Sequence, residues 1–397
     1  MKTTGRLAIS LSLFVMLTYL LSIYGTSEKK IITGAERIEM YLSLLEGKKV
    51  ALVANHTSKI NDTHLLDSLL SLKINVVKIF TPEHGFRGVA DAGEQLNNYV
   101  DSSTGLPVIS LYGKIKKPKP EHLEGVNTVI FDIQDVGTRF YTYISTMQYV
   151  MEACAENDVE FVVFDRPNPN GFYVDGPILD PEHKSFVGMN PIPVVHGLTV
   201  AEYARMINGE RWLKNGIQCK LKYIPCENYD HNKAYELPIK PSPNLPDMLS
   251  IYLYPSLCLF EGTIMSVGRG TDFPFQVFGH PAYVNETFSF TPGSNEGASN
   301  PKYSGIECKG VDLRDIEYRF FWQERRIILN WLIDAYNNMK EKGDFFNSYF
   351  SKLSGTQELQ KQIESGLSPE DIYKSWEPGL IQYKQIRKKY LLYPDFE

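Results

Sequence analysis

The sequence is poor in cysteine and has no cluster of positive charge. It contains five cysteines in 397 residues, and none form a Cys-x-x-Cys pair, so neither a zinc ribbon nor a dithiol redox site is indicated. We expect buried free thiols, because a chain of this length can bury a sufficient core without disulfides. Lysine and arginine (41) are outnumbered by aspartate and glutamate (47). No basic tract stands out, and a nucleic-acid partner is therefore not expected.

The motifs of several common ligand sites are also missing. The segment Asn55–Lys59 (NHTSK) lacks every glycine of a dinucleotide fingerprint, and no P-loop occurs. The absence of a G-x-S-x-G elbow disfavours a serine hydrolase of that type. No HxH or HExxH spacing supports a metal site. A site built from His84, Asp132 and His196 stays open only as an alternative.

The one long apolar run lies at the N-terminus. Lys2 and Arg6 precede an apolar segment over residues 7–24, which is the pattern of a signal peptide or an N-terminal anchor over residues 1–25. The run is long for a cleaved signal and short for a membrane span. We therefore expect an exported protein, periplasmic or extracellular, that contacts a membrane only if this segment is retained.

Short runs rich in β-branched residues alternate with helical patterns in the first half of the chain. Strands are expected at 49–54, 76–80, 107–111, 128–133, 160–164 and 219–224. Helices are expected at 64–72, 142–156 and 200–213, the last opened by a capping box at Thr199. This alternation predicts an α/β fold with a parallel sheet covered by helices on both faces.

A cluster of prolines marks the expected domain junction at Pro238, Pro241, Pro243 and Pro246. We assign residues 30–238 to the α/β domain and residues 239–397 to a smaller α+β domain. In the second domain, a long amphipathic helix is expected at 324–342. Another helix should start after the N-cap Ser368 and stop before Pro378, and a further helix should precede Tyr390.

Polar residues collect where the expected strands end. These segments are 55–57 (NHT), 81–87 (TPEHGFR), 132–139 (DIQDVGTR) and 165–171 (DRPNPNG). Ligands of open parallel sheets bind beyond the carboxyl ends of the strands. Any one segment could simply cap a loop, but four exceed what solvation requires. We therefore expect the four loops to form a single acidic pocket.

Carboxylates in these loops are candidates for acid–base chemistry. A partly desolvated Glu83 would have a raised pKa, as a general acid needs. Asp132 or Asp135 could supply the second carboxylate of a glycoside hydrolase. The structural alternatives are that Glu83 caps a loop or pairs with Arg87, and that the aspartates pair with Arg139.

Three arginines have forked donors suited to a carboxylate or phosphate, namely Arg139, Arg166 and Arg269. Internal ion pairs with Asp135 and Asp165 are the alternative. The glycine-rich segment 267–271 is expected to form a tight turn that presents Arg269. Tyr141 could stack on a sugar ring or could begin a packed helix.

Long, unusual strings occur in a fixed order along the chain: FTPEHGFR (80–87), FDIQDVGTRFY (131–141), DRPNPNG (165–171), PVVHGLT (193–199), PSPNLP (241–246), EGT (261–263), SVGRGT (266–271) and KYLLYP (389–394). From about residue 35 to the C-terminus the chain resembles the bacterial exo-β-N-acetylmuramidase family, peptidoglycan glycoside hydrolases formerly known as a domain of unknown function.

The resemblance implies a Rossmann-like catalytic domain whose cleft is completed by the smaller C-terminal domain. It also implies release of N-acetylmuramic acid from the non-reducing end of peptidoglycan fragments, and it makes Glu83 the catalytic residue. We expect Glu83 to protonate the leaving oxygen, and Asp132 or Asp135 to activate water or stabilise the transition state. The 2-acetamido group of the substrate could instead take part. No cofactor is required.

Substrate contacts are expected from the same loops. Arg139 or Arg166 would bind the lactyl carboxylate that distinguishes muramic acid from glucosamine, and His84 and His196 would hold sugar hydroxyls. The other expected contacts are Arg87, Tyr141, Asn168, Asn170 and Arg269. Two other functions stay open, a metal-dependent hydrolase of another cell-wall bond and a non-catalytic cell-wall sugar-binding protein.

Overall fold

The computed structural model describes residues 29–83, 85–86, 98–284 and 287–397. The predicted leader (1–25), His84 and Arg87 lie outside these residues. Within the described ranges, no helix is both long enough and apolar enough to cross a membrane.

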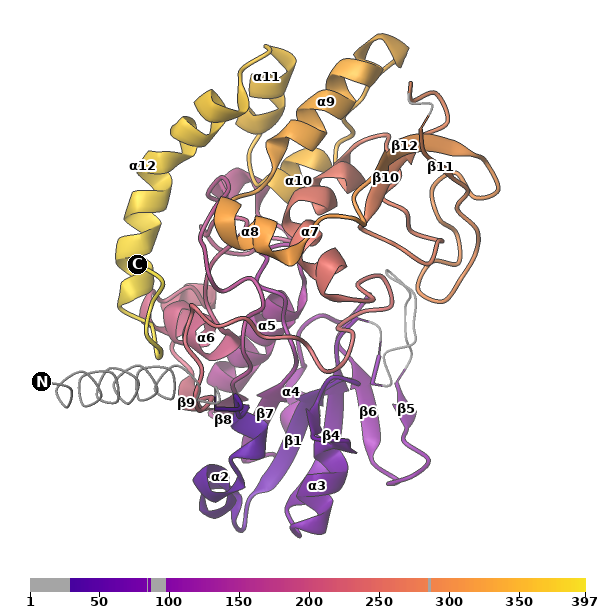
Figure 1. The fold of residues 1–397 in the computed structure, drawn as a ribbon. Coiled ribbons are helices and arrows are strands. Elements are labelled where there is room, and N and C mark those ends of the chain that lie inside the picture. Colours follow the sequence, from indigo (N-terminus) through magenta and orange to yellow (C-terminus); the bar gives the residue numbers. More distant parts are fainter. Residues whose placement is uncertain (1–28, 84, 87–97, 285–286) are drawn as a thin grey trace, which may run out of the picture.

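A seven-stranded sheet forms the first part of the molecule (Figure 1). The strands, in spatial order, are β5 (Tyr99–Val100), β6 (Pro107–Ser110), β4 (Asn75–Thr81), β1 (Lys49–Ala54), β7 (Thr128–Asp132), β8 (Glu160–Phe164) and β9 (Lys220–Ile224). All neighbours are parallel except β5, which pairs antiparallel with β6 at one edge. Numbered along the chain, the parallel strands run 3-2-1-4-5-6, which is the order of a Rossmann fold. The predicted α/β class is confirmed.

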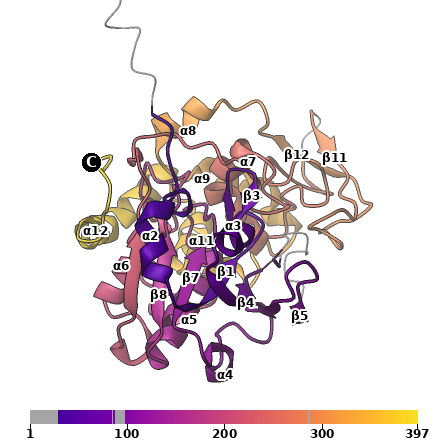
Figure 2. The ribbon, with the colours of Figure 1, turned by 90° about the horizontal axis from the view of Figure 1, so that it is seen from below.

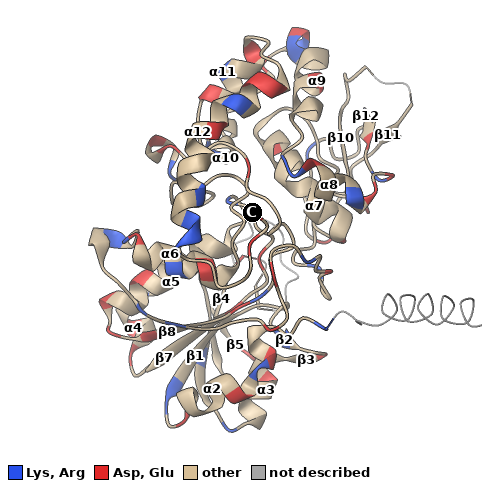
Figure 3. Ribbon diagram, turned by 60° about the vertical axis from the view of Figure 1, so that its left-hand side comes forward, with Lys and Arg blue, Asp and Glu red and all other residues tan. Residues whose placement is uncertain are grey.

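The two faces of the sheet are buried against different helices. Val50, Leu52 and Ala54 of β1 lie in one apolar cluster with α2 (Ile38–Leu45) and α3 (Leu65–Ser71). Ala51 and Val53 point to the opposite face, where α5 (Tyr143–Glu156) and α6 (Val200–Gly209) pack. Figure 3 shows this three-layer arrangement with the sheet between the two helix pairs. The alternation follows from the two-residue period of a strand.

The second part is built mainly from helices. It contains α7 (Met248–Leu257), η4 (Cys258–Gly262), α8 (Tyr318–Glu324), α9 (Leu329–Met339), η5 (Lys340–Lys342), α10 (Phe350–Ser354), α11 (Glu358–Glu364) and α12 (Pro369–Lys388). A small antiparallel sheet joins them, in the order β10 (Val277–His280), β12 (Cys308–Asp312), β11 (Ser289–Phe290). Figures 1 and 2 place this sheet and α12 on opposite sides of the molecule.

Short elements complete the chain: η1 (Gly34–Glu36), the hairpin of β2 (Lys59–Ile60) and β3 (Thr63–His64), α4 (Pro120–Leu123), η2 (Pro181–His183) and η3 (Lys214–Gly216). One apolar cluster contains residues of α5, α6, α7, α9 and α12, so the two parts share a core. The boundary proposed between residues 238 and 239 stays a prediction. All five cysteines are buried and free, as expected.

The predicted helix at 324–342 is wrong in its first turn. α8 ends at Glu324, Arg325 is left-handed (φ 49°), and α9 starts only at Leu329. The intervening amide groups are bound by side chains from elsewhere. The N–H of Ile327 donates to Asp175 Oδ2 at 2.7 Å, and that of Ile328 donates to Ser256 Oγ at 2.9 Å. These tertiary hydrogen bonds replace the helical ones.

The predicted stop before Pro378 is also wrong, because α12 runs through this residue to Lys388. A proline inside a helix removes one hydrogen bond and crowds the preceding turn. Pro378 lies on the exposed side of α12, where water can bind the carbonyl that loses its donor. Buried Trp376 and Tyr383 hold the helix on either side of the proline.

The C-terminal segment binds back onto the Rossmann-like part. The guanidinium of Arg387, fully buried, donates to the carbonyl oxygen of Gly197 at 2.7 and 2.9 Å and to the Asp395 carboxylate. The Tyr393 hydroxyl donates to Asp165 Oδ2 at 2.5 Å and accepts from the N–H of Cys226 at 2.7 Å. The KYLLYP string therefore joins the end of the chain to the loop after β8.

Candidate active site

A cavity of about 690 Å³ lies between the carboxyl edge of the sheet and the second part of the molecule. This volume is in the range of small-ligand sites. The loops after β4 and β6 and the start of α5 line one side. Its lining residues are Glu83, Tyr112, Lys116, Phe140, Thr142, 185–187, Tyr254, Cys258, Glu261, Arg269, 297–302, Tyr349, Lys352 and Leu353.

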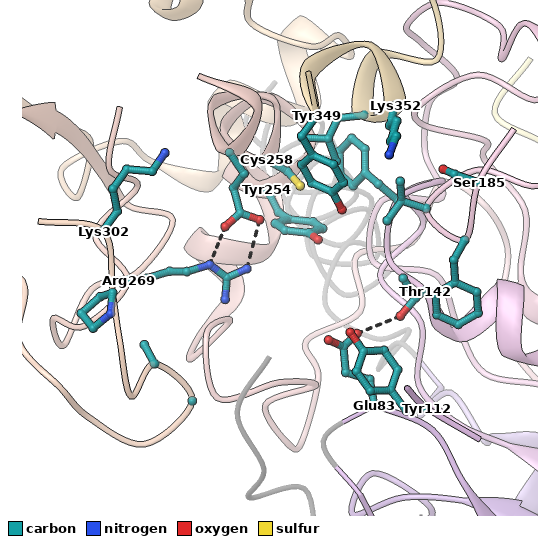
Figure 4. A pocket seen from close by; sticks show the side chains of 18 of the residues that line it. Glu83, Tyr112, Thr142, Ser185, Tyr254, Cys258, Arg269, Lys302, Tyr349 and Lys352 are labelled. Carbon is teal, nitrogen blue, oxygen red and sulfur yellow. Dashed lines mark hydrogen bonds and ion pairs between the residues drawn. The ribbon is translucent and has the colours of Figure 1, made fainter. Parts of the chain in front are cut away.

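Glu83 enters this cavity from the end of β4. The last strand residue, Thr81, is buried, and Pro82 then turns the chain so that half-buried Glu83 follows directly. Thr142, the N-cap residue of α5, donates its hydroxyl to Glu83 Oε2 at 3.0 Å (Figure 4). The start of a long helix therefore positions the donor that orients this carboxyl group.

Phenol groups lie close to Glu83. Burial raises the pKa of Tyr112, and the adjacent Glu83 carboxylate, with which Tyr112 is hydrogen-bonded, raises it further. Burial also raises the pKa of Tyr143 and of Tyr349, and the charge of Glu83 adds to both. These phenols therefore stay protonated and are hydrogen-bond donors at neutral pH.

An arginine–glutamate pair lies in the same cavity. Arg269 Nε donates to Glu261 Oε1 at 2.6 Å, and Nη2 donates to Oε2 at 3.1 Å. Burial acts to lower the pKa of Arg269, but the Glu261 carboxylate raises it overall. Gly268 (φ 76°) and Gly270 (φ 82°) make the turn that presents Arg269, as the glycine-rich segment predicts.

Three lysines add positive charge to the lining. The Lys302 ammonium donates to the carbonyl oxygens of Thr263 (2.7 Å) and Met265 (2.9 Å). Lys116 lies over the Phe186 ring with its Nζ 4.3 Å from the centroid. Lys352 comes from α10 and points into the cavity in Figure 4. Neither Lys116 nor Lys352 forms an ion pair with any residue that the structure describes.

Asp132 and Arg166 do not line this cavity. Asp132 is fully buried at the end of β7 and accepts from Arg166 Nε (2.6 Å) and Nη2 (2.8 Å). The alternative of an internal ion pair is therefore the one observed for Arg166, although its partner is Asp132 on the neighbouring strand and neither Asp135 nor Asp165. Arg166 lines a different pocket.

Asp135 and His196 are buried side by side outside the lining of the cavity. His196 Nδ1 accepts from the N–H of Leu198, and its Nε2 lies 3.8 Å from Asp135 Oδ2, beyond hydrogen-bond distance. Asp135 Oδ2 accepts from the N–H of Gly137 at 2.7 Å. Burial raises the pKa of Asp135 to about 7 and lowers that of His196 to about 3. Both groups are enclosed and neither lines the cavity, so neither is placed to contact a sugar.

Arg139 and Tyr141 are likewise committed to the backbone. The Arg139 guanidinium is buried and donates to four carbonyl oxygens, those of Pro177, Ile192, Leu353 and Ser354, at 2.6–3.0 Å. The Tyr141 hydroxyl donates to the carbonyl of Pro241 at 2.9 Å. Because these donors bind backbone carbonyls, neither side chain is available to a ligand. Arg139 instead stabilises the segments around the cavity, and Tyr141 packs just before the start of α5.

Asn168 and Asn170 also serve the loops themselves. Asn168 Nδ2 donates to the carbonyl of Leu198, and Asn170 Nδ2 donates to those of Val136 and Ile251. A Cβ atom on Gly137 (φ 80°) would lie 2.1 Å from Asn168 Oδ1. The DIQDVGTR and DRPNPNG loops therefore pack against each other and leave little space between them.

Of the predicted site residues that the structure describes, Glu83 and Arg269 line the cavity and the others do not. The expectation of one pocket lined by all four strand-end loops is wrong, because most of those side chains satisfy buried backbone groups. Sequence reasoning missed Tyr112, Thr142, Glu261, Lys302, Tyr349 and Lys352. The EGT string contained Glu261, but Tyr349 and Lys352 lie on a short helix without any distinctive pattern.

The alternative metal site is not assembled from the described residues. Among them, no three His, Cys, Asp or Glu side chains are grouped so that they could hold an ion. Asp132 and His196 have separate partners, and His84 lies outside the described residues.

Two family models match the chain. "Exo-beta-N-acetylmuramidase NamZ, N-terminal" matches residues 50–249, and "Exo-beta-N-acetylmuramidase NamZ, C-terminal" matches residues 252–393. The chain is also 39% identical over 386 residues to the peptidoglycan β-N-acetylmuramidase NamZ of Bacillus subtilis (strain 168). That alignment covers 92% of each chain.

Two crystal structures of DUF1343 family proteins from Bacteroides fragilis have the same fold. One is 48% identical with a TM-score of 0.87, and the match covers 92% of this chain and 100% of the other. The second is 30% identical with a TM-score of 0.72, and the match covers 91% of this chain and 99% of the other.

Proposed function

The chain belongs to the exo-β-N-acetylmuramidase NamZ family and is a glycosidase, and from this premise we propose that it releases N-acetylmuramic acid from the non-reducing end of peptidoglycan fragments. The activity would serve cell-wall turnover. Membership of an enzyme family overturns the alternative of a non-catalytic sugar-binding protein.

The observation that carries the mechanism is the position of Glu83 in the cavity, with Thr142 bound to one carboxyl oxygen. We propose that Glu83 is the general acid, which protonates the glycosidic oxygen as its bond to the anomeric carbon breaks. Such proton transfer accelerates reactions by about 10²–10⁴-fold. The Thr142 hydroxyl keeps the carboxyl group in one orientation.

Positive charge then develops at the anomeric carbon, and a carboxylate or a nucleophile must stabilise it. Asp132 and Asp135 are poor candidates because both are enclosed outside the cavity. Glu261 lines the cavity, but Arg269 holds both of its oxygens. We therefore favour attack by the oxygen of the substrate's own 2-acetamido group, followed by water, as in the substrate-assisted glycosidases.

The lactyl carboxylate needs a cation that is not already paired. Of the two arginines expected for this role, Arg139 is bound internally and Arg166 lines the other pocket, so neither reaches this cavity. Lys352 and Lys116 line the cavity and have no carboxylate partner among the described residues. We propose that one or both bind the lactyl group, with Lys352 first because its ammonium points into the cavity (Figure 4).

Turnover of a chromogenic N-acetylmuramide tests the acid. Glu83→Gln should lower kcat by about 10³-fold or more with an unchanged circular dichroism spectrum. Glu121→Gln makes the same chemical change at an exposed residue of α4 and should leave kcat unaltered. Near-normal turnover by folded Glu83→Gln would refute the assignment.

Paired substrates test the lactyl site. Lys352→Met should lower kcat/KM for the muramide by about tenfold, and the same change should spare the N-acetylglucosaminide, which lacks the carboxylate. Lys116→Met gives the matched comparison at the other lysine of the lining that has no ion-pair partner among the described residues. Equal losses on both substrates would show that the lysine does not read the lactyl group.

We propose that the enzyme works outside the cytoplasm, supported by the charged and apolar pattern of residues 1–25. Cell fractionation, with mass spectrometry of the protein's N-terminus, tests this. Enzyme confined to the cytoplasmic fraction with an intact leader would contradict it.

A further inference from the structure

A second pocket of about 560 Å³ lies along the same carboxyl edge of the sheet and shares no lining residue with the first. It is formed by η1, the turn after β1, the loop after β8 and the segment 233–239. Ligands of doubly wound sheets bind at this edge, between the loops of neighbouring strands. Its lining residues are 29–31, Thr33, Glu36, Thr57, Lys59, Asn61, Asp62, Arg166, 233–236, Pro238 and Ile239.

Arg166 supplies an unused donor to this pocket although the residue is only 5% exposed. Asp132 accepts from its Nε and Nη2, and the carbonyl of Lys59 also accepts from Nη2. Nη1 has no hydrogen-bond partner among the described residues. It is also not one of the polar atoms that the protein encloses completely without a hydrogen bond, so it is accessible from the pocket. The fork is thus held rigidly along one side while Nη1 is open toward the pocket.

Two further groups beside Arg166 are available. The hydroxyl of Tyr235 forms no hydrogen bond with any described residue, and neither does the ammonium group of Lys59. Tyr235 and Arg166 line the same pocket, and burial raises the pKa of Tyr235 to about 12, so its hydroxyl stays protonated and can donate at neutral pH. A fixed guanidinium N–H, a phenol and an ammonium together suit an anion with oxygen acceptors.

The remaining charges decide which anion fits. Lys30 pairs with Glu36, and Lys233 lies near Asp230. Lys29 adds one more positive group, whereas the unpaired acids Asp62 and Glu236 also line the pocket. Because Asp132 already balances Arg166, the pocket has little excess positive charge. A carboxylate with one negative charge is therefore favoured over a phosphate group, which carries about −1.5 to −2 when attached as a monoester.

We propose that this pocket is a second binding site, for the carboxylate group of a small organic acid. Arg166 Nη1 and the Tyr235 hydroxyl donate to the carboxylate oxygens, and Lys59 supplies the neighbouring charge. The proposal rests on the geometry of this pocket and is independent of the function proposed for the first.

Binding of acetate to the full chain tests the site, followed by NMR of ¹⁵N-arginine-labelled protein. Tyr235→Phe and Lys59→Met are the informative variants, because both leave the buried Asp132–Arg166 pair intact. Each lost contact should weaken acetate binding by about fivefold, and the double variant by about twentyfold. Neither residue lines the first cavity, so glycosidase turnover should be unchanged and reports that the variants fold.

Lys352→Met serves as the control in the first cavity and should leave the acetate-dependent arginine shifts unaltered. Inorganic phosphate, the second probe, should bind more weakly than acetate. Unchanged acetate affinity in the double variant would overturn the site, and tighter binding of phosphate would overturn the carboxylate assignment. Loss of acetate binding in Lys352→Met alone would place the anion in the first cavity.

Discussion

Replacing Asp135 with asparagine should change how the stability of the protein depends on pH. Asp135 is 5% exposed, and burial raises the pKa of its carboxyl group to about 7. In an unfolded chain the value is about 3.9. The two values differ by about three pH units, and each unit corresponds to about 1.4 kcal/mol, so about 4 kcal/mol is at stake.

The sign follows from the direction of the change. Because the folded-state pKa is the higher one, the protonated carboxyl group stabilises the fold below about pH 4, and this contribution is lost as the pH rises to about 7. Asparagine has the same shape and does not ionise. The free energy of unfolding of Asp135→Asn, relative to the unsubstituted protein, should therefore rise by about 1.4 kcal/mol per pH unit between pH 4 and 7.

His196 contributes in the opposite direction. Its folded-state pKa of about 3 lies below the unfolded value, so its contribution is present above about pH 6.5 and is lost as the pH falls. This contribution is common to both proteins and largely cancels in the difference. Urea unfolding followed by tryptophan fluorescence at pH 4.5, 5.5, 6.5 and 7.5 measures the difference. Asp315→Asn, at an exposed position, is the control and should show no trend.

A difference that stays constant with pH would refute the reasoning. If the free energy of unfolding of Asp135→Asn, relative to the unsubstituted protein, falls as the pH rises, an ionised Asp135 pairs with a protonated His196. In that case the aspartate would again be a candidate for a functional charge instead of a neutral buried group.

Two further predictions concern the supports of the site, and a third concerns a metal requirement. Tyr393→Phe removes the hydrogen bonds to Asp165 and from the N–H of Cys226, and should lower the free energy of unfolding by about 1–3 kcal/mol; an unchanged urea midpoint would contradict this. Arg139→Lys keeps the positive charge, but a lysine cannot donate to all four carbonyl oxygens. The free energy of unfolding should fall by about 3 kcal/mol in the same urea assay. A loss below about 0.5 kcal/mol would show that the guanidinium group is dispensable. Dialysis against EDTA should leave muramide turnover at its full value, because carboxylate acid catalysis uses no ion, whereas loss and recovery on adding a metal would favour the metal-dependent alternative.

Periodicity and composition in the sequence were enough to predict the α/β class and the six parallel strands β1, β4, β6, β7, β8 and β9, whereas the two-residue strands β2, β3 and β5 were not predicted. Five of these strands are short apolar runs that are largely buried, which leaves a local signature, whereas the edge strand β9 is mostly exposed. Local patterns were also enough to identify Glu83 as a candidate, because it directly follows a buried strand. Local patterns predicted a continuous helix through Arg325, where hydrogen bonds from distant side chains break it. They predicted a helix end before Pro378, where buried residues on one face of α12 keep the helix intact.

Only the tertiary structure decided which polar residues face the cavity. Asp132, Asp135, Arg139 and Asn170 are of the same residue types as active-site groups and follow the same strands. In the folded chain, however, each satisfies a buried charge or backbone group. Glu261 and Lys352 reach the cavity from the second half of the chain. Sequence spacing carries no information on the direction of a loop side chain, since burial and hydrogen bonding to remote segments determine it.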